Sequence, residues 1–136
     1  SNPHAAMGLA QLSKIDLITK SRRSSCERYS ERLGHLDSVE LPPTDFKDVV
    51  PFLYFIRVDA KSRDNLRTYL LENGVDTGIH WQPGHQFSLF SGARAGDLSV
   101  TDKIASEIIS LPLHSDMELP TVDFVCQKIF DFFNKR

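Results

Sequence analysis

Residues 52–58 read Phe-Leu-Tyr-Phe-Ile-Arg-Val, a dense run of aromatic and β-branched side chains. Such side chains favour extended backbone because they pack well on the pleated surface of a sheet. The run therefore predicts a β-strand, and its apolar density places that strand centrally in a sheet.

The sequence that follows predicts a helix and then a second strand. The helix is expected from residue 62 or 63 to residue 73, and Gly74 is expected to stop it in the left-handed conformation. One face of this helix is apolar and carries Leu66, Tyr69 and Leu70. Residues 75–81 are then expected to return as a strand.

Two more helices are expected after a loop at residues 82–96 that is rich in Gly, Ser and Arg. The first spans residues 101–110 and turns three apolar side chains inward, Ile104, Ile108 and Ile109. A short apolar piece follows at residues 111–113. The last helix starts at Pro120 or Thr121, and its apolar positions recur at Val122, Val125, Ile129, Phe132 and Phe133.

Upstream of the strand, the prolines and acidic residues of segment 41–51 indicate a connection, and one long helix is expected before it. Asn2 can cap this helix, Pro3 suits its first turn, and Gly34 ends it. Apolar side chains recur along it at Leu12, Ile15, Ile18, Cys26, Tyr29 and Leu33. So long an apolar stripe needs a surface to lie against, which we expect to include a domain outside this sequence.

Length and composition fit a single globular domain. The chain has 136 residues, of which 40% are hydrophobic and 25% charged, enough for one ordinary core. Strands and helices are mixed without a regular βαβ rhythm. We therefore predict an α+β fold in which a small, mainly antiparallel sheet is covered by helices, with a long helix at the N-terminus.

The charge and the cysteines limit which partners and which cellular compartment are expected for this chain. The net charge is −2 without a long block of like charges, so neither nucleic acid nor an anionic membrane is expected as a partner. No stretch approaches the roughly 20 apolar residues that cross a bilayer, and no signal sequence is evident, which favours the cytoplasm. Cys26 and Cys126 are expected to be buried free thiols.

The chemically richest segment is residues 77–87, Thr-Gly-Ile-His-Trp-Gln-Pro-Gly-His-Gln-Phe. Two imidazoles, an indole and amides meet where the predicted strand runs into a loop, a common position for binding sites. His80, Trp81 and His85 can form a polar and aromatic wall against a ligand. Alternatively, the histidines only satisfy local backbone groups.

Other kinds of site are disfavoured. His80, His85 and His114 could supply three nitrogens to a metal, but their spacing fixes no ligand geometry and no Cys or carboxylate accompanies them, so no metal site is expected. Residues 24–26, Ser-Ser-Cys, fit the polar face of a helix better than a nucleophile. Neither the dinucleotide-binding nor the P-loop glycine pattern occurs.

Three stretches resemble the DegT/DnrJ-type sugar aminotransferases, in the order and spacing of that family. The opening resembles the segment that follows the family's Asn-Tyr-Arg-Met stretch, at positions Ala5, Ala6, Gly8, Gln11 and Leu12. The family's arginine-aspartate, leucine, glycine-isoleucine, threonine-glycine, histidine-tyrosine run is similar to Arg63-Asp64, Leu66, Leu70 and residues 73–81. Residues 110–114, Ser-Leu-Pro-Leu-His, match its leucine-proline-leucine-histidine signature.

Three positions depart from the common family pattern. Trp81 stands where tyrosine is usual, Gln82 where proline is frequent, and Gly84 where leucine is frequent. These positions fall in the segment that faces the sugar, so they bear on the identity of the substrate. By resemblance, His80, Trp81 and His85 border the substrate pocket beside the cofactor.

The resemblance implies that residues 1–136 form the C-terminal small domain of a fold-type I aminotransferase whose N-terminal domain, which binds pyridoxal 5′-phosphate (PLP), is absent from this sequence. The parent enzyme would be a homodimer that transfers an amino group from an amino acid, typically glutamate, to a nucleotide-linked keto-deoxysugar. Such reactions serve the biosynthesis of cell-surface polysaccharide, including lipopolysaccharide, or of secondary metabolites.

The chain's own lysines fall on expected helix faces or in loops, outside the family's lysine motif: Lys14, Lys20, Lys47, Lys61, Lys103, Lys128 and Lys135. A Schiff-base lysine is required for PLP-dependent transamination. We therefore expect the chain alone to contain no catalytic residue, to bind no PLP and to be inactive. The alternative function is a stand-alone ligand-binding or regulatory α+β module.

Overall fold

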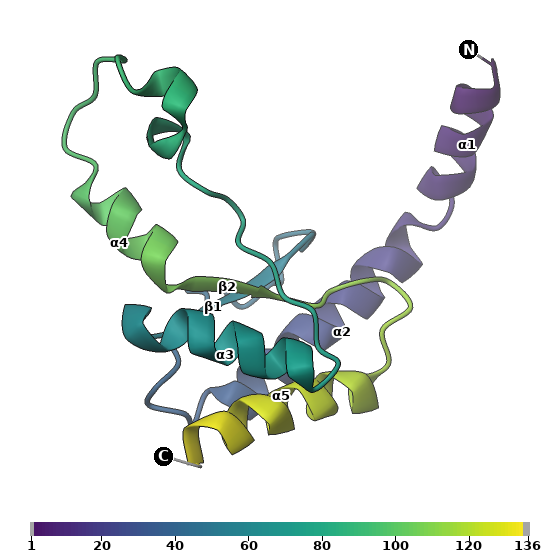
Figure 1. Cartoon of the computed structure of the whole chain (residues 1–136). Helices are drawn as coiled ribbons and strands as arrows, with labels where there is room; N and C mark the ends of the chain where they lie inside the picture. The colour runs from purple at the N-terminus through teal and green to yellow at the C-terminus, as the bar shows by residue number, and fades with distance from the viewer. Residues whose placement is uncertain (1, 135–136) are drawn as a thin grey trace.

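The fold is built from helices arranged around a very small sheet (Figure 1). The computed structural model describes residues 2–134. In chain order the elements are α1 (Asn2–Leu12), α2 (Ile15–Leu33), β1 (Tyr54–Arg57), α3 (Ala60–Glu72), two 3₁₀ turns (Gly84–Gln86 and Ser88–Phe90), α4 (Ser99–Glu107), β2 (Ile108–Leu111) and α5 (Leu119–Asn134).

The two strands pair antiparallel, with Tyr54 opposite Leu111 and Arg57 opposite Ile108. Each edge is extended by one isolated bridge, Glu40 to Arg57 on one side and Gly78 to Ser110 on the other. β1 therefore has backbone partners on both sides, which confirms its predicted central position. The α+β expectation is confirmed as well.

Two predicted elements are wrong. Of residues 75–81, only Gly78 pairs with the sheet, since the carbonyl oxygen of Thr77 accepts a hydrogen bond from Arg67 instead of from a strand. The helix predicted over residues 101–110 ends at Glu107, and the chain passes directly into β2. All four residues of β2 are buried. In the sequence, its run of apolar side chains on both faces of the strand could not be distinguished from the apolar face of a helix.

The long N-terminal helix is also divided. Ser13 and Lys14 interrupt it, where Ser13 Oγ donates a hydrogen bond to the carbonyl of Ala10 and Lys14 N bonds to Gln11 O in a tighter turn. Asn2, the expected cap, is already the first residue of α1. Gly34 ends α2 in a right-handed conformation, whereas Gly74 has φ of +79° and stops α3 as predicted.

The core lies where α2, α3 and α5 pack together on one side of the sheet (Figure 1). Tyr29 of α2 stacks on Tyr54 of β1 with ring centroids 4.9 Å apart. Both buried hydroxyls are satisfied: that of Tyr29 donates to the carbonyl of Pro112, and that of Tyr54 bonds to Ser30. Each polar tip thus fixes where its ring can sit.

Cys26 and Cys126 are buried in this core as free cysteines, as expected. Burial raises the pKa of each thiol to about 12, because a thiolate would lose its hydration. Neither side chain is therefore a ready nucleophile.

Helix α1 projects away from this core as an arm (Figure 1). The predicted apolar stripe is buried at its C-terminal end, at Cys26, Tyr29 and Leu33. Its N-terminal part is exposed, with other apolar side chains of α1 and early α2: Met7, Leu9, Leu12, Ile15 and Leu17. No helix within residues 2–134 is both long and apolar enough to cross a membrane.

Helices α2 and α5 are also joined by an ion pair at the rim of the core. Arg28 donates two hydrogen bonds to the carboxylate of Asp123, over 2.8 and 3.0 Å, and Arg32 lies 3.4 Å from the same group. The hydrogen bonds from Arg28 hold the pKa of Asp123 below its ordinary value of 3.8. The pair thus stabilises the packing of two helices that are far apart in sequence.

Replacing Asp123 with asparagine should lower the free energy of unfolding at neutral pH. A carboxyl group whose pKa is depressed in the folded state stabilises the fold above its unfolded-state pKa, and this contribution is lost as the pH falls through the folded-state value. Urea unfolding of both proteins across the acid range measures the difference, which should vanish in strong acid. Glu31→Gln is the control, because that exposed carboxylate should matter little. A difference that persists unchanged in acid would contradict this account.

Candidate functional site

The candidate site begins where the chain leaves the sheet at Gly78. Gly78 and Ser110 exchange two backbone hydrogen bonds, of 3.0 and 2.8 Å. The imidazole of His80 folds back over Gly78, so closely that a Cβ atom there would clash with His80 Cε1. A side chain at position 78 would therefore force this ring to move.

The structure brings His80 and Trp81 together with a third aromatic residue. The rings of His80 and Trp81 meet edge to face with centroids 5.4 Å apart. The indole of Trp81 stacks on Phe52, just before β1, at 6.2 Å. Trp81 and Phe52 are 67% and 65% exposed, so they offer an uncovered aromatic surface to a ligand.

A hollow of about 410 Å³ adjoins this aromatic surface. Its polar lining comes from Asp76, Thr77, His80 and Ser110, and Phe52 lies at its edge. The hydroxyl of Ser110 is buried and has no hydrogen-bond partner. An unsatisfied buried hydroxyl can bond to a ligand group that enters the hollow.

His85 is held elsewhere, against α4. Its Nε2 lies 2.8 Å from Asp102 Oδ1, and the side-chain amide of Gln86 donates to the same oxygen over 2.8 Å. These two hydrogen bonds, that of Gln86 first, lower the pKa of Asp102. Gln86 and Asp102 belong to the lining of a second hollow, of about 390 Å³. Of the three predicted site residues, only His80 lines the first hollow, and neither Trp81 nor His85 is among the lining residues of either hollow.

Several residues of the first hollow were not singled out from the sequence. Ser110 directly precedes the Leu-Pro-Leu-His stretch, and Asp76 lies within the run that resembles the sugar aminotransferases. Their place in these motifs was the available signal. Phe52 gave none, because an aromatic residue at the start of an apolar strand reads as core.

Metal coordination has no support in the described part of the chain. Within residues 2–134, no group of three or more His, Cys, Asp and Glu side chains is placed to hold a metal ion. His114, weighed above as a third ligand, is exposed in the segment between β2 and α5 and lines neither of the two hollows.

Residues 1–130 match the model of the DegT/DnrJ/EryC1/StrS aminotransferase family. The chain belongs to this family. The match extends from the first residue to near the end of α5, so it includes both hollows.

Solved structures share the fold of this family member. Aminotransferase TlmJ from Streptoalloteichus hindustanus is 27% identical, with a TM-score of 0.85 over 96% of this chain and 36% of its own. NtdA from Bacillus subtilis, solved with bound cofactor PMP (pyridoxamine phosphate), is 29% identical, with a TM-score of 0.85 over 96% of this chain and 32% of its own. Helicobacter pylori PseC, at 19% identity and a TM-score of 0.83, covers 96% of this chain and 37% of its own and shows likeness of fold alone. The chain thus spans about a third of these proteins.

The family implies PLP, but the residues of this chain do not fit a PLP site. Among the lysines within residues 2–134, all are exposed except Lys128, whose ammonium lies 5.2 Å from the ring centroid of Phe124. None lines the hollow beside His80 or the one beside Asp102. Lys135 lies outside the described residues. Neither hollow therefore offers the lysine that PLP chemistry requires as a Schiff base.

Gly78→Ala should displace the imidazole of His80, because the added methyl group would occupy its position. The fluorescence of Trp81, the only tryptophan in the chain, should change because the His80 ring contacts it. Gly84→Ala is the matched control in the same segment, since nothing lies within 4 Å of a Cβ atom there. Unchanged Trp81 emission and unchanged His80 ring resonances in Gly78→Ala would show that the His80 ring does not occupy this position.

Proposed function

We propose that this chain acts as the C-terminal small domain of a longer, PLP-dependent aminotransferase. The parent would transfer an amino group from an amino acid, glutamate by expectation, to the keto group of a nucleotide-linked deoxysugar. The observation that carries this proposal is membership of the aminotransferase family over residues 1–130 in a chain that spans about a third of its solved relatives.

The cofactor would be held by residues outside this chain. NtdA was solved with PMP, and S. venezuelae DesV, 27% identical, was solved with a ketimine intermediate. PLP supplies the means of carrying the amino group between two substrates. The lysines described here do not fit that role, which supports a contribution of this chain to binding rather than to bond making.

The contribution proposed for this chain is substrate binding by His80, Trp81 and His85. The hollow beside His80 combines hydrogen-bonding groups, among them Asp76 and Ser110, with the aromatic surface of Phe52 and Trp81. A sugar presents both hydroxyls and apolar ring faces, and such a wall can bind both. His85 would act at the border of this region, with the loop that its bond to Asp102 holds against α4.

The exposed apolar side chains of α1 fit a location within a larger assembly. Isolated apolar patches of this kind usually mark an interface. We propose that the rest of the parent chain or a second copy in a homodimer covers them. The free buried cysteines are consistent with the cytoplasm, and the pathway would be synthesis of cell-surface polysaccharide, such as lipopolysaccharide, or of a secondary metabolite.

The 136-residue chain alone should neither bind PLP covalently nor transaminate, because it lacks a suitable lysine. Visible absorption after mixing with PLP and dialysis measures this directly. A stoichiometric Schiff-base band that survives dialysis and disappears on replacement of one particular lysine would refute the proposal. The coding region upstream supplies an independent test, since the proposal requires a lysine motif there.

In the longer protein, His80→Ala should lower kcat/KM for the keto sugar by about 5- to 150-fold, the effect of losing a hydrogen bond of about 1–3 kcal/mol in a desolvated pocket. kcat/KM for the amino donor should change little. Steady-state kinetics with each substrate varied gives both values. His35→Ala, at an exposed histidine in the segment after α2, is the control. A loss confined to the amino donor would show that His80 does not bind the sugar.

A further inference from the structure

Arg63, on the first turn of α3, is a largely covered cation with buried donor atoms. Only 16% of its side chain is exposed, and its Nε and Nη1 atoms are buried without a hydrogen-bond partner. The carboxylate of Asp64 lies 2.9 Å from Nε, but it is 76% exposed and does not form an aligned hydrogen bond. Nη1 therefore faces no acceptor.

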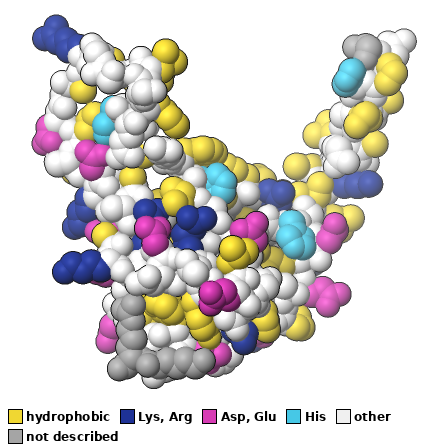
Figure 2. All heavy atoms as spheres, viewed as in Figure 1, with side chains coloured by type: hydrophobic (Ala, Val, Ile, Leu, Met, Phe, Trp, Pro, Cys, Tyr) yellow, Lys and Arg dark blue, Asp and Glu magenta, His cyan; other side chains and the backbone are white. Residues whose placement is uncertain are grey.

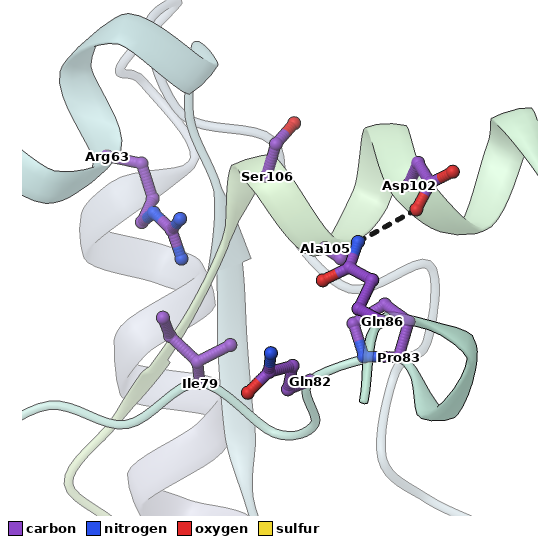
Figure 3. A pocket seen from close by; sticks show the side chains of 8 residues that line it. All are labelled: Arg63, Ile79, Gln82, Pro83, Gln86, Asp102, Ala105 and Ser106. Atoms are coloured by element: carbon purple, nitrogen blue, oxygen red, sulfur yellow. Dashed lines mark hydrogen bonds between the residues drawn. The ribbon is translucent and has the colours of Figure 1, made fainter. Parts of the chain in front are cut away.

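The guanidinium group points into the second hollow, the one of about 390 Å³ (Figure 3). The side-chain amide of Gln82 also points into this space, below Ser106 (Figure 3). Apolar side chains of Ile79, Pro83 and Ala105 complete much of the wall. The hollow is large enough for a small organic molecule and offers it a cation.

Burying the donor atoms of a cation without an acceptor is costly, because their lost hydration is not replaced. In proteins, the water lost from a guanidinium group is usually replaced by an anion with two oxygens. The planar group binds such an anion through two parallel N–H···O hydrogen bonds. Asp64 approaches the guanidinium group at Nε, and Nη1 has no acceptor. The missing partner is therefore an acceptor that enters from the hollow.

Asp102 on the opposite wall decides which kind of anion fits. Its carboxylate is ionised and already accepts hydrogen bonds from Gln86 and His85 on one oxygen. A second, multiply charged anion would be repelled by it across a hollow of this size. A group with a single negative charge experiences less repulsion, and a carboxylate has the planar shape that matches the guanidinium fork.

We propose that this hollow binds a carboxylate group, held by Arg63 and the amide of Gln82. The carboxylate belongs either to a free organic acid or to an Asp or Glu side chain of the longer parent protein. The site is distinct from the hollow beside His80, so it does not depend on the proposed function.

Acetate is the probe for the 136-residue chain, titrated against chloride at equal ionic strength. Acetate should raise the unfolding temperature in a saturable manner and shift the Nε–Hε resonance of Arg63, whereas inorganic phosphate should bind more weakly. Arg63→Met should weaken acetate binding at least about tenfold, and Arg63→Lys should give an intermediate loss because the fork is missing. Arg94→Met is the control, since exposed Arg94 lines neither hollow and should leave binding unchanged.

Stability without acetate separates a binding role from a structural one. If Arg63 serves to bind a ligand, the Arg63→Met variant should be at least as stable as the unsubstituted 136-residue chain, because a costly buried charge is removed. A large loss of stability in that variant, an acetate effect that survives it, or phosphate binding as tight as acetate binding would each overturn the proposal. In the longer protein, a persisting response to acetate indicates a free acid. A lost response together with destabilisation by Arg63→Met indicates an internal acidic side chain.

Discussion

The pairing of β1 with β2 is the constraint on which the rest of this fold depends. Four residue pairs join strands that are separated by more than a third of the chain, and one isolated bridge at each edge completes the sheet. Arg57 reinforces this junction, since its guanidinium bonds to Glu40 on one side and to Glu107, the last residue of α4, on the other. So small a sheet has little stability by itself. Its apolar face must be covered, and α2, α3 and α5 provide that cover.

The same pairing positions both hollows. Because Gly78 bonds to the outer edge of β2, the chain that follows must leave the sheet at that point, with His80 folded over Gly78 and Trp81 stacked on Phe52. Because α4 continues directly into β2, Asp102 is fixed relative to the sheet and holds His85 and Gln86. One strand thus positions two chemically different hollows, one beside aromatic rings and lined by two hydroxyls, the other lined by Arg63, whose Nη1 has no acceptor.

The body of the molecule and helix α1 have different surfaces. Hydrophobic and charged side chains alternate over the body in the view of Figure 2, whereas α1 rises from it with hydrophobic groups on its surface. Ion pairs such as that between Arg28 and Asp123 join helices of the body and lie partly covered. α1 itself contributes no buried residue. The core therefore does not account for the apolar side chains of α1, which supports the contact proposed for this helix.

The sequence by itself determined what depends on local pattern. Apolar periodicity identified α3 and α5, the aromatic run identified β1, and Gly74 marked a helix end because only a residue without Cβ adopts its left-handed backbone easily. Motifs in order also identified the family. They also grouped His80, Trp81 and His85, although only His80 lines one of the two hollows.

Only the tertiary structure decided between alternatives that local pattern leaves equal. Ile108 and Ile109 suit a buried helix or a buried strand, and the backbone groups of β1, some 50 residues away, made them a strand. The fate of polar groups was equally non-local. His85 forms a hydrogen bond with Asp102, and the carbonyl of Thr77 accepts one from Arg67, whereas Nη1 of Arg63 has no acceptor. A side chain's hydrogen-bond partners depend on which distant segments fold against it, and periodicity along the chain carries no information about them.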